Sequence, residues 1–236
     1  MEIGTQFGKY TIIAKLGEGG MGVVYKATNE QGDVFALKVL HKHLGEKNPL
    51  LKERFKQEAE ALEQMSRGGG HPNIVRCFEH GEEDGQLYLV LEFLQGESLQ
   101  APMNRTAYKL PPHLASKLIR EVCRALAFAH EAGIVHRDVK PDNVFLCLER
   151  GEGERVSLKR IKVLDFGIAR HLKVEGGRLT ATGHIFGTLR YMSPQHLMSS
   201  KDADEQDDVW AIGALFYRLL TGEDAYPYDV DELGKA

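Results

Sequence analysis

Short apolar runs separated by turn residues fill the first part of the chain and predict β-strands. These runs are rich in β-branched and aromatic residues, and they lie at 10–16, 23–28, 34–40, 74–78 and 86–93. The polar stretch His80–Gly85 is expected to be the turn between the last two strands. One stretch has a different period: Phe55, Ala59, Leu62 and Met65 recur at helical spacing, which predicts a helix over residues 51–66.

Helical patterns dominate the second part of the chain. Residues 113–132 carry a single apolar stripe, which predicts an amphipathic helix that stops at Gly133. The stripe consists of Leu114, Leu118, Val122, Ala125, Leu126 and Ala129. Residues 208–220 are apolar on nearly every face, so this helix is expected at the centre of a core. Two short strands are expected at 144–148 and 161–164, with the polar segment 149–159 as a solvated hairpin extension.

The composition changes from strand-rich to helix-rich near Leu94–Gly96. We therefore expect two lobes, residues 1–94 and residues 95–236. The predicted fold class is α+β, with a small antiparallel sheet and one helix in the first lobe and a mainly helical second lobe.

Composition and charge narrow the class of protein. The 236 residues are 42% hydrophobic, which is enough for a sizeable core, and the net charge of −4 argues against a general nucleic-acid binder. Three widely spaced cysteines indicate reduced thiols in the cytoplasm rather than a disulfide framework. The N-terminus lacks the regions of a signal peptide, and no apolar run reaches the ~20 residues needed to cross a bilayer. We expect a cytoplasmic domain with no membrane contact in this segment and no nucleic-acid partner, and the full-length protein could be membrane-anchored beyond residue 236.

The stretch Ile134–Asn143 concentrates an acid, two bases and an amide directly after the predicted helix 113–132. Pro141 cannot continue a helix and disfavours helical angles at the residue before it, so the stretch is a loop. It fits the pattern H-R-D-x-x-x-x-N, in which Asp138 accepts the proton of an attacking hydroxyl and Asn143 holds a magnesium ion. The plainer alternative is a capped turn between two elements.

A glycine-rich segment separates the first two strands, and its residues are Gly17, Glu18, Gly19, Gly20, Met21 and Gly22. Glycines let a backbone approach phosphate oxygens closely. A dinucleotide-binding fold would place a helix after this G-x-G-x-x-G pattern, whereas Val23–Ala27 reads as a strand. The pattern therefore favours a hairpin lid over phosphates, the alternative being an ordinary flexible turn.

Lys38 lies in the middle of the apolar strand 34–40, where an unpaired charge is costly. Either its amine reaches solvent from the sheet edge, or it pairs with ATP phosphates and a helical glutamate. The helix 51–66 offers Glu53, Glu58, Glu60 and Glu63. Glu58 is the chosen partner, because it stacks one turn from Leu62 on the apolar face.

Asp165-Phe166-Gly167 directly follows the strand 161–164. A carboxylate suits a hard cation that keeps some of its water, so Asp165 is the expected principal magnesium ligand. An Asx turn at a strand end is the alternative. Residues 168–190 have little apolar periodicity and are expected to form a long functional loop.

Taken in order, the glycine loop, Lys38, Glu58, His136–Asn143 and Asp165–Gly167 resemble the eukaryotic-like protein kinases. The segments Leu16–Tyr25 and Phe166–Arg170 are most similar to bacterial Hanks-type serine/threonine kinases, and the resemblance spans essentially the whole chain. It implies the two-lobed kinase fold and transfer of the ATP γ-phosphate to Ser or Thr hydroxyls of protein substrates.

The resemblance also assigns residues to the nucleotide. Leu91 would be the gatekeeper, and Glu92 and Leu94 would bind adenine through their backbone. Leu16, Val24, Ala36 and Phe145 would complete the adenine pocket beside the glycine loop. Lys38 would position phosphates, and Asn143 and Asp165 would hold Mg²⁺, with Mn²⁺ as an alternative.

For catalysis, the resemblance implies that Asp138 orients the hydroxyl and takes its proton late, while Lys140 stabilises the γ-phosphate. Thr188 would hydrogen-bond near Asp138, and Gly187–Pro194 would seat the residue after the phospho-acceptor. Thr180 and Thr182 are the expected activating phosphorylation sites, with a second kinase copy as the partner for autophosphorylation. Arg137 and Arg170 would bind the phosphate.

Two departures from the family pattern matter. The family's A-P-E reads Ser193-Pro194-Gln195, and a glutamine cannot form the usual ion pair with a later arginine. The chain also ends soon after the apolar helix, so the second lobe is expected to be incomplete, poorly stable and weakly active alone. A pseudokinase scaffold that binds nucleotide without transfer is the alternative function, and a small-molecule kinase is a weaker third.

Overall fold

The computed structural model describes residues 1–19, 22–42, 49–105, 108–150, 156–166, 189–195 and 204–226. The chain divides into two compact units. Unit 1 comprises Met1–His71 and Val75–Leu94, and unit 2 comprises Pro72–Ile74 and Gln95–Ala236. The expected lobes, 1–94 and 95–236, remain a prediction, and the units differ from them in assigning Pro72–Ile74 to the second.

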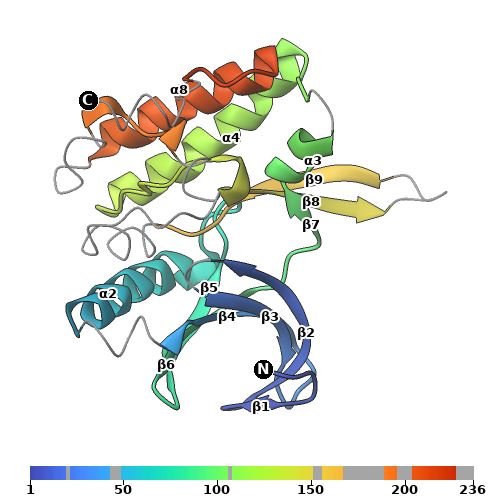
Figure 1. Ribbon diagram of the computed structural model, residues 1–236, viewed down its shortest axis with the longest axis vertical. Helices are drawn as coiled ribbons and strands as arrows, with labels where there is room; N and C mark the ends of the chain where they lie inside the picture. The colour runs from blue at the N-terminus through green and yellow to red at the C-terminus, as the bar shows by residue number, and fades with distance from the viewer. Residues whose placement is uncertain are drawn as a thin grey trace, which may run out of the picture. The chain divides into compact units, whose positions relative to one another are not determined.

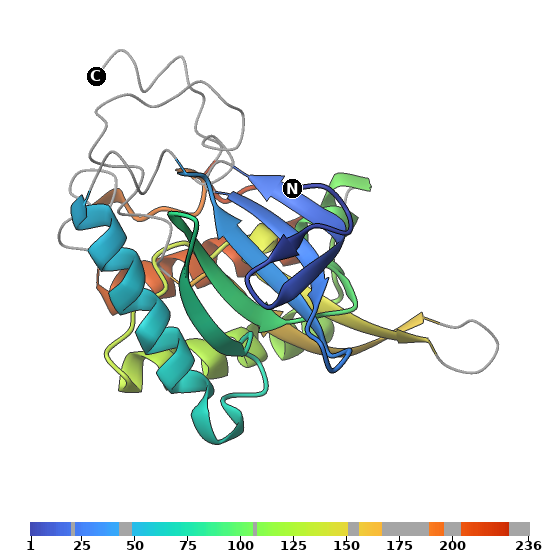
Figure 2. The same ribbon diagram turned by 90° about the horizontal axis from the view of Figure 1, so that it is seen from below.

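A six-stranded antiparallel sheet with the order β1-β2-β3-β4-β6-β5 forms unit 1 (Figures 1 and 2). Its strands are β1 (Gln6–Phe7), β2 (Tyr10–Gly19), β3 (Gly22–Thr28), β4 (Val34–Leu40), β5 (Cys77–Glu83) and β6 (Gln86–Glu92). The helix α2 (Pro49–Ser66) packs against β5, and the short 3-10 helix η1 (Arg67–Gly69) follows it. The predicted apolar face of α2 is confirmed, because Phe55, Ala59, Leu62 and Met65 are all buried.

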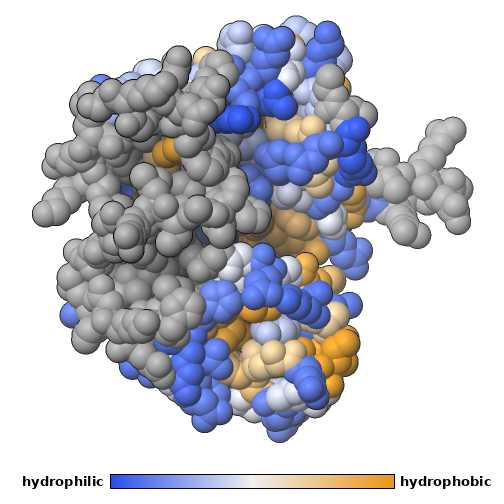
Figure 3. Space-filling model, viewed as in Figure 1, coloured by the Kyte–Doolittle hydropathy of each residue, from blue (hydrophilic) through white to orange (hydrophobic). Residues whose placement is uncertain are grey.

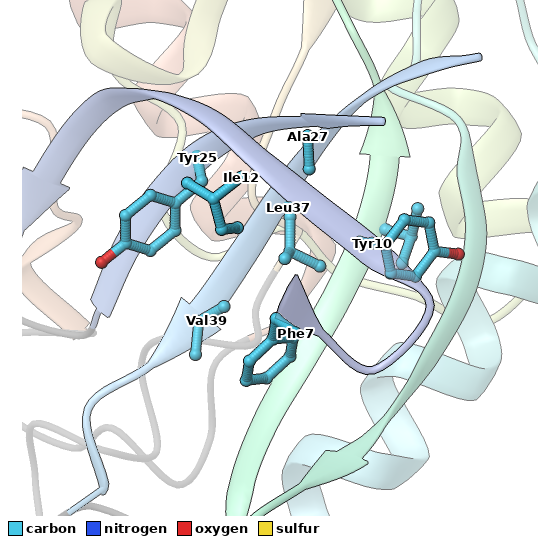
Figure 4. Packing of buried hydrophobic residues seen from close by; sticks show 8 residues of the cluster. Phe7, Tyr10, Ile12, Tyr25, Ala27, Leu37 and Val39 are labelled. Carbon is cyan, nitrogen blue, oxygen red and sulfur yellow. The ribbon is translucent and has the colours of Figure 1, made fainter. Parts of the chain in front are cut away.

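One face of this sheet carries the core of unit 1. Alternate residues of β4, Leu37 and Val39, point into a cluster with residues of β2 and β3, because successive side chains of a strand project to opposite faces (Figure 4). The buried cluster contains Phe7, Tyr10, Ile12, Tyr25, Ala27, Leu37, Val39 and Val90. The intervening residues of β4, among them Lys38, therefore project to the opposite face.

The predicted turn at His80–Gly85 was too long. Strand β5 continues through Glu83, and Glu83 pairs directly with Gln86, so only Asp84 and Gly85 form the turn. Both have positive φ, 50° and 76°, as a type I′ hairpin turn requires. The polar residues 80–83 misled the prediction because they belong to the last strand of the sheet order, where polar side chains are tolerated.

Unit 2 combines a small sheet with two long helices. Its elements are β7 (Gly96–Ser98), α3 (Gln100–Arg105), α4 (Pro112–Glu131), the 3-10 helix η2 (Pro141–Asn143), β8 (Val144–Arg150), β9 (Val156–Val163) and α8 (Glu205–Thr221). The sheet order is β7-β8-β9. Helices α4 and α8 pack side by side (Figure 1). Strands β8 and β9 are longer than predicted, and the exposed residues Ser157–Arg160 form part of the expected solvated extension.

The amphipathic helix predicted at 113–132 is α4. Leu118, Val122 and the three other central members of the stripe are buried, but Leu114 was assigned wrongly, because 43% of it is exposed. It lies in the first turn of the helix, where the neighbouring Ala115 is the buried residue. The helix ends as predicted: Gly133 has φ 73° and donates its N–H to the carbonyl oxygen of His130.

Helix α8 begins in a capping box and ends at a glycine. The Asp204 side chain accepts from the Gln206 N–H, and Asp207 accepts from the Asp204 N–H, while Gly222 at φ 81° closes the other end. Its burial is less complete than predicted. Ala211, Leu215 and Leu219 are buried, but Val209 is 57% exposed. The apolar sequence of α8 therefore predicted more burial than the described residues provide.

The described surface is mixed in character. Figure 3 shows hydrophobic residues at the surface over the strands of unit 1, in the lower part of the view. Exposed large hydrophobic residues of this unit include Ile3, Ile13 and Leu16. None of the helices in the described ranges is long and apolar enough to cross a membrane.

Candidate active site

The glycine-rich segment is a β-hairpin. Strands β2 and β3 pair in antiparallel register, with Gly17 opposite Val24, Glu18 opposite Val23, and Gly19 opposite Gly22. The tip, Gly20 and Met21, lies outside the described residues. A strand follows the glycines, so the interpretation as a hairpin rather than a strand–helix dinucleotide motif is correct.

The glycines of this hairpin have different surroundings. A Cβ at Gly22 would lie 2.2 Å from the Val39 carbonyl oxygen, so close packing against β4 excludes any larger residue there. A Cβ at Gly17 or Gly19 would meet no described atom within 4 Å, and neither residue has positive φ. Packing and backbone conformation within the described part of unit 1 therefore do not require glycine at 17 and 19. Room for a ligand close to the backbone would account for glycine at both positions.

The strand register places several predicted nucleotide residues on one face of the sheet. Lys38 lies opposite Val24 on β3, and Ala36 lies opposite Leu91 on β6. Directly paired residues share a face, as do alternate residues of one strand. Val24, Ala36, Lys38 and Leu91 therefore project to the face opposite the core cluster. Lys38 is 9% exposed, which disfavours the alternative of an amine that reaches solvent from the sheet edge.

The other predicted residues of unit 1 lie on β6, after it, and on α2. The Glu92 carboxylate accepts the Arg76 N–H at 2.7 Å, while the Glu92 N–H donates to the Arg76 carbonyl at 2.9 Å. These bonds hold the backbone of Glu92 in position two residues before Leu94. Glu58 lies within α2, but its side chain is outside what the structure describes. Its pairing with Lys38 stays a prediction.

In unit 2, the predicted catalytic residues lie together. Lys140 Nζ lies 3.1 Å and 2.9 Å from the two carboxylate oxygens of Asp138. Asn143 Nδ2 donates to the Asp138 carbonyl at 2.7 Å and to its carboxylate at 3.1 Å. The carboxylate is thus held from two sides. Helix η2, which begins at Pro141, turns the chain so that Asn143 faces back toward Asp138.

A buried carboxylate from α8 positions the start of this loop. Asp208 is 1% exposed and accepts the backbone N–H groups of His136 at 2.9 Å and Arg137 at 2.8 Å. The His130 ring, from the last turn of α4, lies 2.8 Å from the same carboxylate. Asp208 is therefore an acceptor for the loop, whereas Asp204 caps the helix.

Two histidines, His136 and His130, have structural roles that were not predicted from the sequence. His136 is fully buried, accepts the Asp138 N–H at Nδ1 (3.2 Å) and lies 2.8 Å from the Leu164 carbonyl at Nε2. Both contacts are satisfied by the neutral ring protonated on Nε2. The ring also packs on Phe166, with centroids 4.7 Å apart. His130 gave only a weak signal in the sequence, a polar residue in the last turn of an amphipathic helix.

Two non-glycine residues of the site have left-handed backbone angles, Arg137 at φ 63° and Asp165 at φ 54°. Such angles are uncommon outside glycine and persist where surrounding contacts hold them. For Arg137 the contact is its N–H bond to Asp208. Strained residues of this kind cluster at functional sites, and here both lie in the predicted catalytic motifs.

The side-chain oxygen atoms of Asp165 and Asn143 are suitable ligands for a divalent cation. The Leu164 N–H donates to the Asn143 carbonyl at 2.8 Å, which brings the residue before Asp165 alongside Asn143. One carboxylate and one amide oxygen are the sparse, hard ligand set that Mg²⁺ takes when water and phosphates complete its shell. Among the described residues there is no group of three His, Cys, Asp or Glu side chains that could hold a metal alone. The residues therefore fit a metal that a phosphorylated ligand helps to bind.

Several predicted residues lie outside the described ranges. They are Gly167, Arg170, Thr180, Thr182 and Thr188. Phe145 is described: it is half-buried on β8, where it pairs with Ser98 and Lys162.

Comparison with known families agrees with this geometry. The sequence profile described as "Protein kinase domain" matches residues 10–234. The chain belongs to the protein kinase family. The kinase fold predicted from the motifs is thereby confirmed. Members of this family use ATP and a divalent metal, generally Mg²⁺.

Relatives narrow the group to bacterial kinases. Serine/threonine-protein kinase Pkn1 of Myxococcus xanthus is 38% identical over 93% of this chain and 30% of its own length. The probable serine/threonine-protein kinase PknB of Lactococcus lactis is 38% identical over 98% of this chain and 34% of its own. This kinase chain thus spans about a third of the length of the curated relatives it matches.

Solved structures show the same likeness. The PknI kinase domain of Mycobacterium tuberculosis has a TM-score of 0.73 at 28% identity, covering 97% of this chain and 78% of that one. The predicted resemblance to bacterial serine/threonine kinases is therefore confirmed.

Proposed function

We propose that this kinase transfers the γ-phosphate of ATP to Ser or Thr hydroxyls of protein substrates. The observation that carries the proposal is the Asp138 carboxylate, bonded to Lys140 and to Asn143 within one loop. A base, a cation and a metal-binding amide at this spacing are the groups that phosphoryl transfer to a hydroxyl needs.

Asp138 serves as the base. Its carboxylate orients the attacking hydroxyl and accepts the proton as the bond to phosphorus forms. A positioned base contributes roughly 10²–10⁴-fold to such a rate. Lys140, already at the carboxylate, offers its ammonium group to the transferring phosphoryl oxygens, where charge spreads in the transition state.

Asn143 and Asp165 are the proposed metal ligands. Asn143 uses its amide nitrogen for Asp138, so its side-chain oxygen is the atom for the metal. Bound there, Mg²⁺ or Mn²⁺ would neutralise charge on the phosphate oxygens. The left-handed angle of Asp165 is consistent with a carboxylate held in one orientation for this task.

The shared sheet face in unit 1 is proposed to hold the nucleotide. Val24, Ala36 and Leu91 supply apolar surface for adenine, and Lys38 on the same face supplies a cation for its phosphates. The exposed backbone at Gly17 and Gly19 supplies N–H groups that approach phosphate oxygens. The backbone of Glu92 and Leu94, and Phe145 of unit 2, are proposed to complete adenine binding. Glu58 is proposed to pair with Lys38.

The deciding experiment measures transfer from labelled ATP to a generic basic protein, followed by identification of the phosphorylated amino acid. Wild-type protein should label Ser or Thr. Lys38→Met should abolish transfer while circular dichroism shows a retained fold, because methionine keeps the bulk and removes the charge. Lys9→Met, at an exposed lysine of the same unit, should stay active. Nucleotide binding without transfer in the wild type would instead support a pseudokinase scaffold.

Activation is proposed to follow autophosphorylation at Thr180 and Thr182, with a second copy of the kinase as partner. Each phosphate adds about −1.5 to −2 charge, which Arg137 and Arg170 could bind. Mass spectrometry of active protein tests this, and finding both threonines unmodified would refute it. A cytoplasmic location is proposed for this domain, in keeping with three cysteines that form no disulfide.

A further inference from the structure

Two carboxylates hold the segment Leu189–Gln195 on helix α8 and on the turn that follows it. The Ser193 hydroxyl donates to the Asp207 carboxylate, in the first turn of α8. The Arg190 guanidinium donates to Asp224, just past the end of the same helix. The segment is therefore attached at both ends of α8, and we refer to residues 189–195 as the seating segment.

The Asp207 contact is buried, and a second hydrogen bond holds the same carboxylate. Ser193 is 3% exposed and Asp207 is 8% exposed. The second oxygen of Asp207 accepts the Asp204 N–H at 3.1 Å in the capping box, which fixes the carboxylate to the start of the helix. A hydrogen bond to a charged, buried acceptor is among the stronger kinds in proteins. This contact is therefore the stronger of the two.

The Asp224 contact is more exposed but is part of a cluster. Arg218 Nε lies 3.6 Å from Asp224, and 15% of the Asp224 side chain is exposed. Tyr191 of the seating segment is buried, and this burial, with Asp224 nearby, raises the pKa of its phenol. Trp210 of α8 stacks on Tyr226 at 4.9 Å, which ties the turn after the helix back to its side.

The sequence at this segment departs from the family pattern at Gln195, whose neutral and exposed side chain cannot form the usual ion pair. We propose that Asp207 and Asp224 replace that ion pair as positioning residues and hold the seating segment for the protein substrate. The proposal deepens the proposed function and rests on it for the role in substrate binding. The role in holding the segment rests on the contacts alone.

Ser193→Ala is the sharpest test, because it removes the hydroxyl and leaves the capping box of α8 intact. Loss of one hydrogen bond to a buried charge should raise KM for a peptide substrate about tenfold. KM for ATP should not change. Hydrogen exchange should quicken for the amides of residues 189–195 and not for those of the catalytic loop.

Asp224→Asn and Arg190→Gln test the second contact, where an exposed pair predicts an increase in peptide KM of only about two- to threefold. The double variant should equal Asp224→Asn, since that substitution already removes the ion pair that Arg190→Gln removes. Glu223→Gln is the matched control: it removes one exposed charge beside Asp224 and should change neither KM nor exchange. Emission of Trp210, the one tryptophan in the sequence, reports on the turn that carries Asp224.

Unchanged exchange in residues 189–195 of Ser193→Ala would overturn the proposal, and so would a peptide KM equal to that of the wild type. If the wild-type chain transfers no phosphate, the proposed function fails. The exchange measurement still decides in that case whether the two carboxylates hold the segment.

Discussion

Residues 134–143 and the hairpin of β2 and β3 are both predicted to act on the phosphates of ATP. The two regions differ in the contacts that hold them in place. In the loop 134–143, a buried carboxylate from α8 accepts two backbone N–H groups, and Asp138, the proposed base, is bonded to Lys140 and Asn143. In the hairpin, residues Leu16–Gly19 are exposed, and a Cβ at Gly17 or Gly19 would meet no described atom.

The difference indicates which of these two regions is held in position before the substrate binds. Chemistry at the hydroxyl needs a base held in one orientation before the substrate arrives, so that no reorganisation is needed during reaction. Phosphate binding by backbone N–H groups needs open space that the ligand itself fills. Substitutions in residues 134–143 should therefore change the rate and the stability. Substitutions in the hairpin of β2 and β3 should change the affinity for nucleotide.

The largest expected effect is at the base. Asp138→Asn should lower kcat by roughly 10²–10⁴-fold, because the amide cannot accept the hydroxyl proton. The melting temperature should stay close to that of the wild type, since the amide keeps the shape of the carboxylate. Asp142→Asn is the matched control, an exposed aspartate four residues along the same loop. Equal rates for the two variants would remove Asp138 from the mechanism.

Asp208→Ala should have the second-largest effect, and it should lower both the stability and the rate. It leaves the N–H groups of His136 and Arg137 without their acceptor, at about 1–3 kcal/mol for each buried group. Urea denaturation should show this loss in the free energy of unfolding, with kcat reduced in the folded fraction. Glu205→Ala, at an exposed acid on the same helix, should cost far less. A stable Asp208→Ala protein would mean that the loop is held by other contacts.

Glycine substitutions within the hairpin should have two different effects, one on ATP binding and one on stability. Gly17→Ala and Gly19→Ala should raise KM for ATP about tenfold at unchanged melting temperature, because the methyl group occupies ligand space only. Gly22→Ala should lower stability by about 1–3 kcal/mol, because its Cβ would overlap the Val39 carbonyl. Thermal melts and ATP titrations on the three variants give the comparison. If Gly17→Ala is as destabilising as Gly22→Ala, the proposal that packing does not require glycine at position 17 is wrong.

The smallest effect is expected at His41. Its Nε2 lies 3.1 Å from the Gly19 carbonyl, a side-chain contact that reaches the exposed end of the hairpin. His41→Ala should raise KM for ATP about twofold, as expected for one exposed hydrogen bond. Hydrogen exchange near Gly19 should quicken slightly while the catalytic loop stays unchanged. A change in kcat would show that the two regions are less separate than proposed.

Much of this arrangement follows from local sequence rules. Strands β2, β3, β4 and β6, the helices α2, α4 and α8, and the loop that carries Asp138 follow from periodicity and from residues such as Pro141 and Gly133. Strand β1 was not predicted, and the strand predicted at 74–78 was placed too early, because β5 spans Cys77–Glu83. These features depend on neighbours in the chain. The short turn at Asp84–Gly85 could also have been predicted, because Asp-Gly between apolar runs is a strong hairpin signal.

Other features depend on residues far apart in the sequence and could not be predicted from local pattern. The left-handed angles of Arg137 and Asp165 are unusual for these residue types, and for Arg137 the cause lies on α8. The bond between Ser193 and Asp207 joins two polar residues that each look like ordinary turn or cap residues. Exposure of Leu114 and Val209 depends on which neighbours reach each end of a helix.

The role of Asp208 also sets an order of events during synthesis. His136 leaves the ribosome 72 residues before Asp208 does. At about 5–20 residues per second, several seconds pass before the loop has its acceptor. During that time the N–H groups of His136 and Arg137 cannot take their final partner, and the left-handed angle at Arg137 lacks the Asp208 contact. A nascent chain can therefore carry every residue of the catalytic motif and still lack the geometry for transfer.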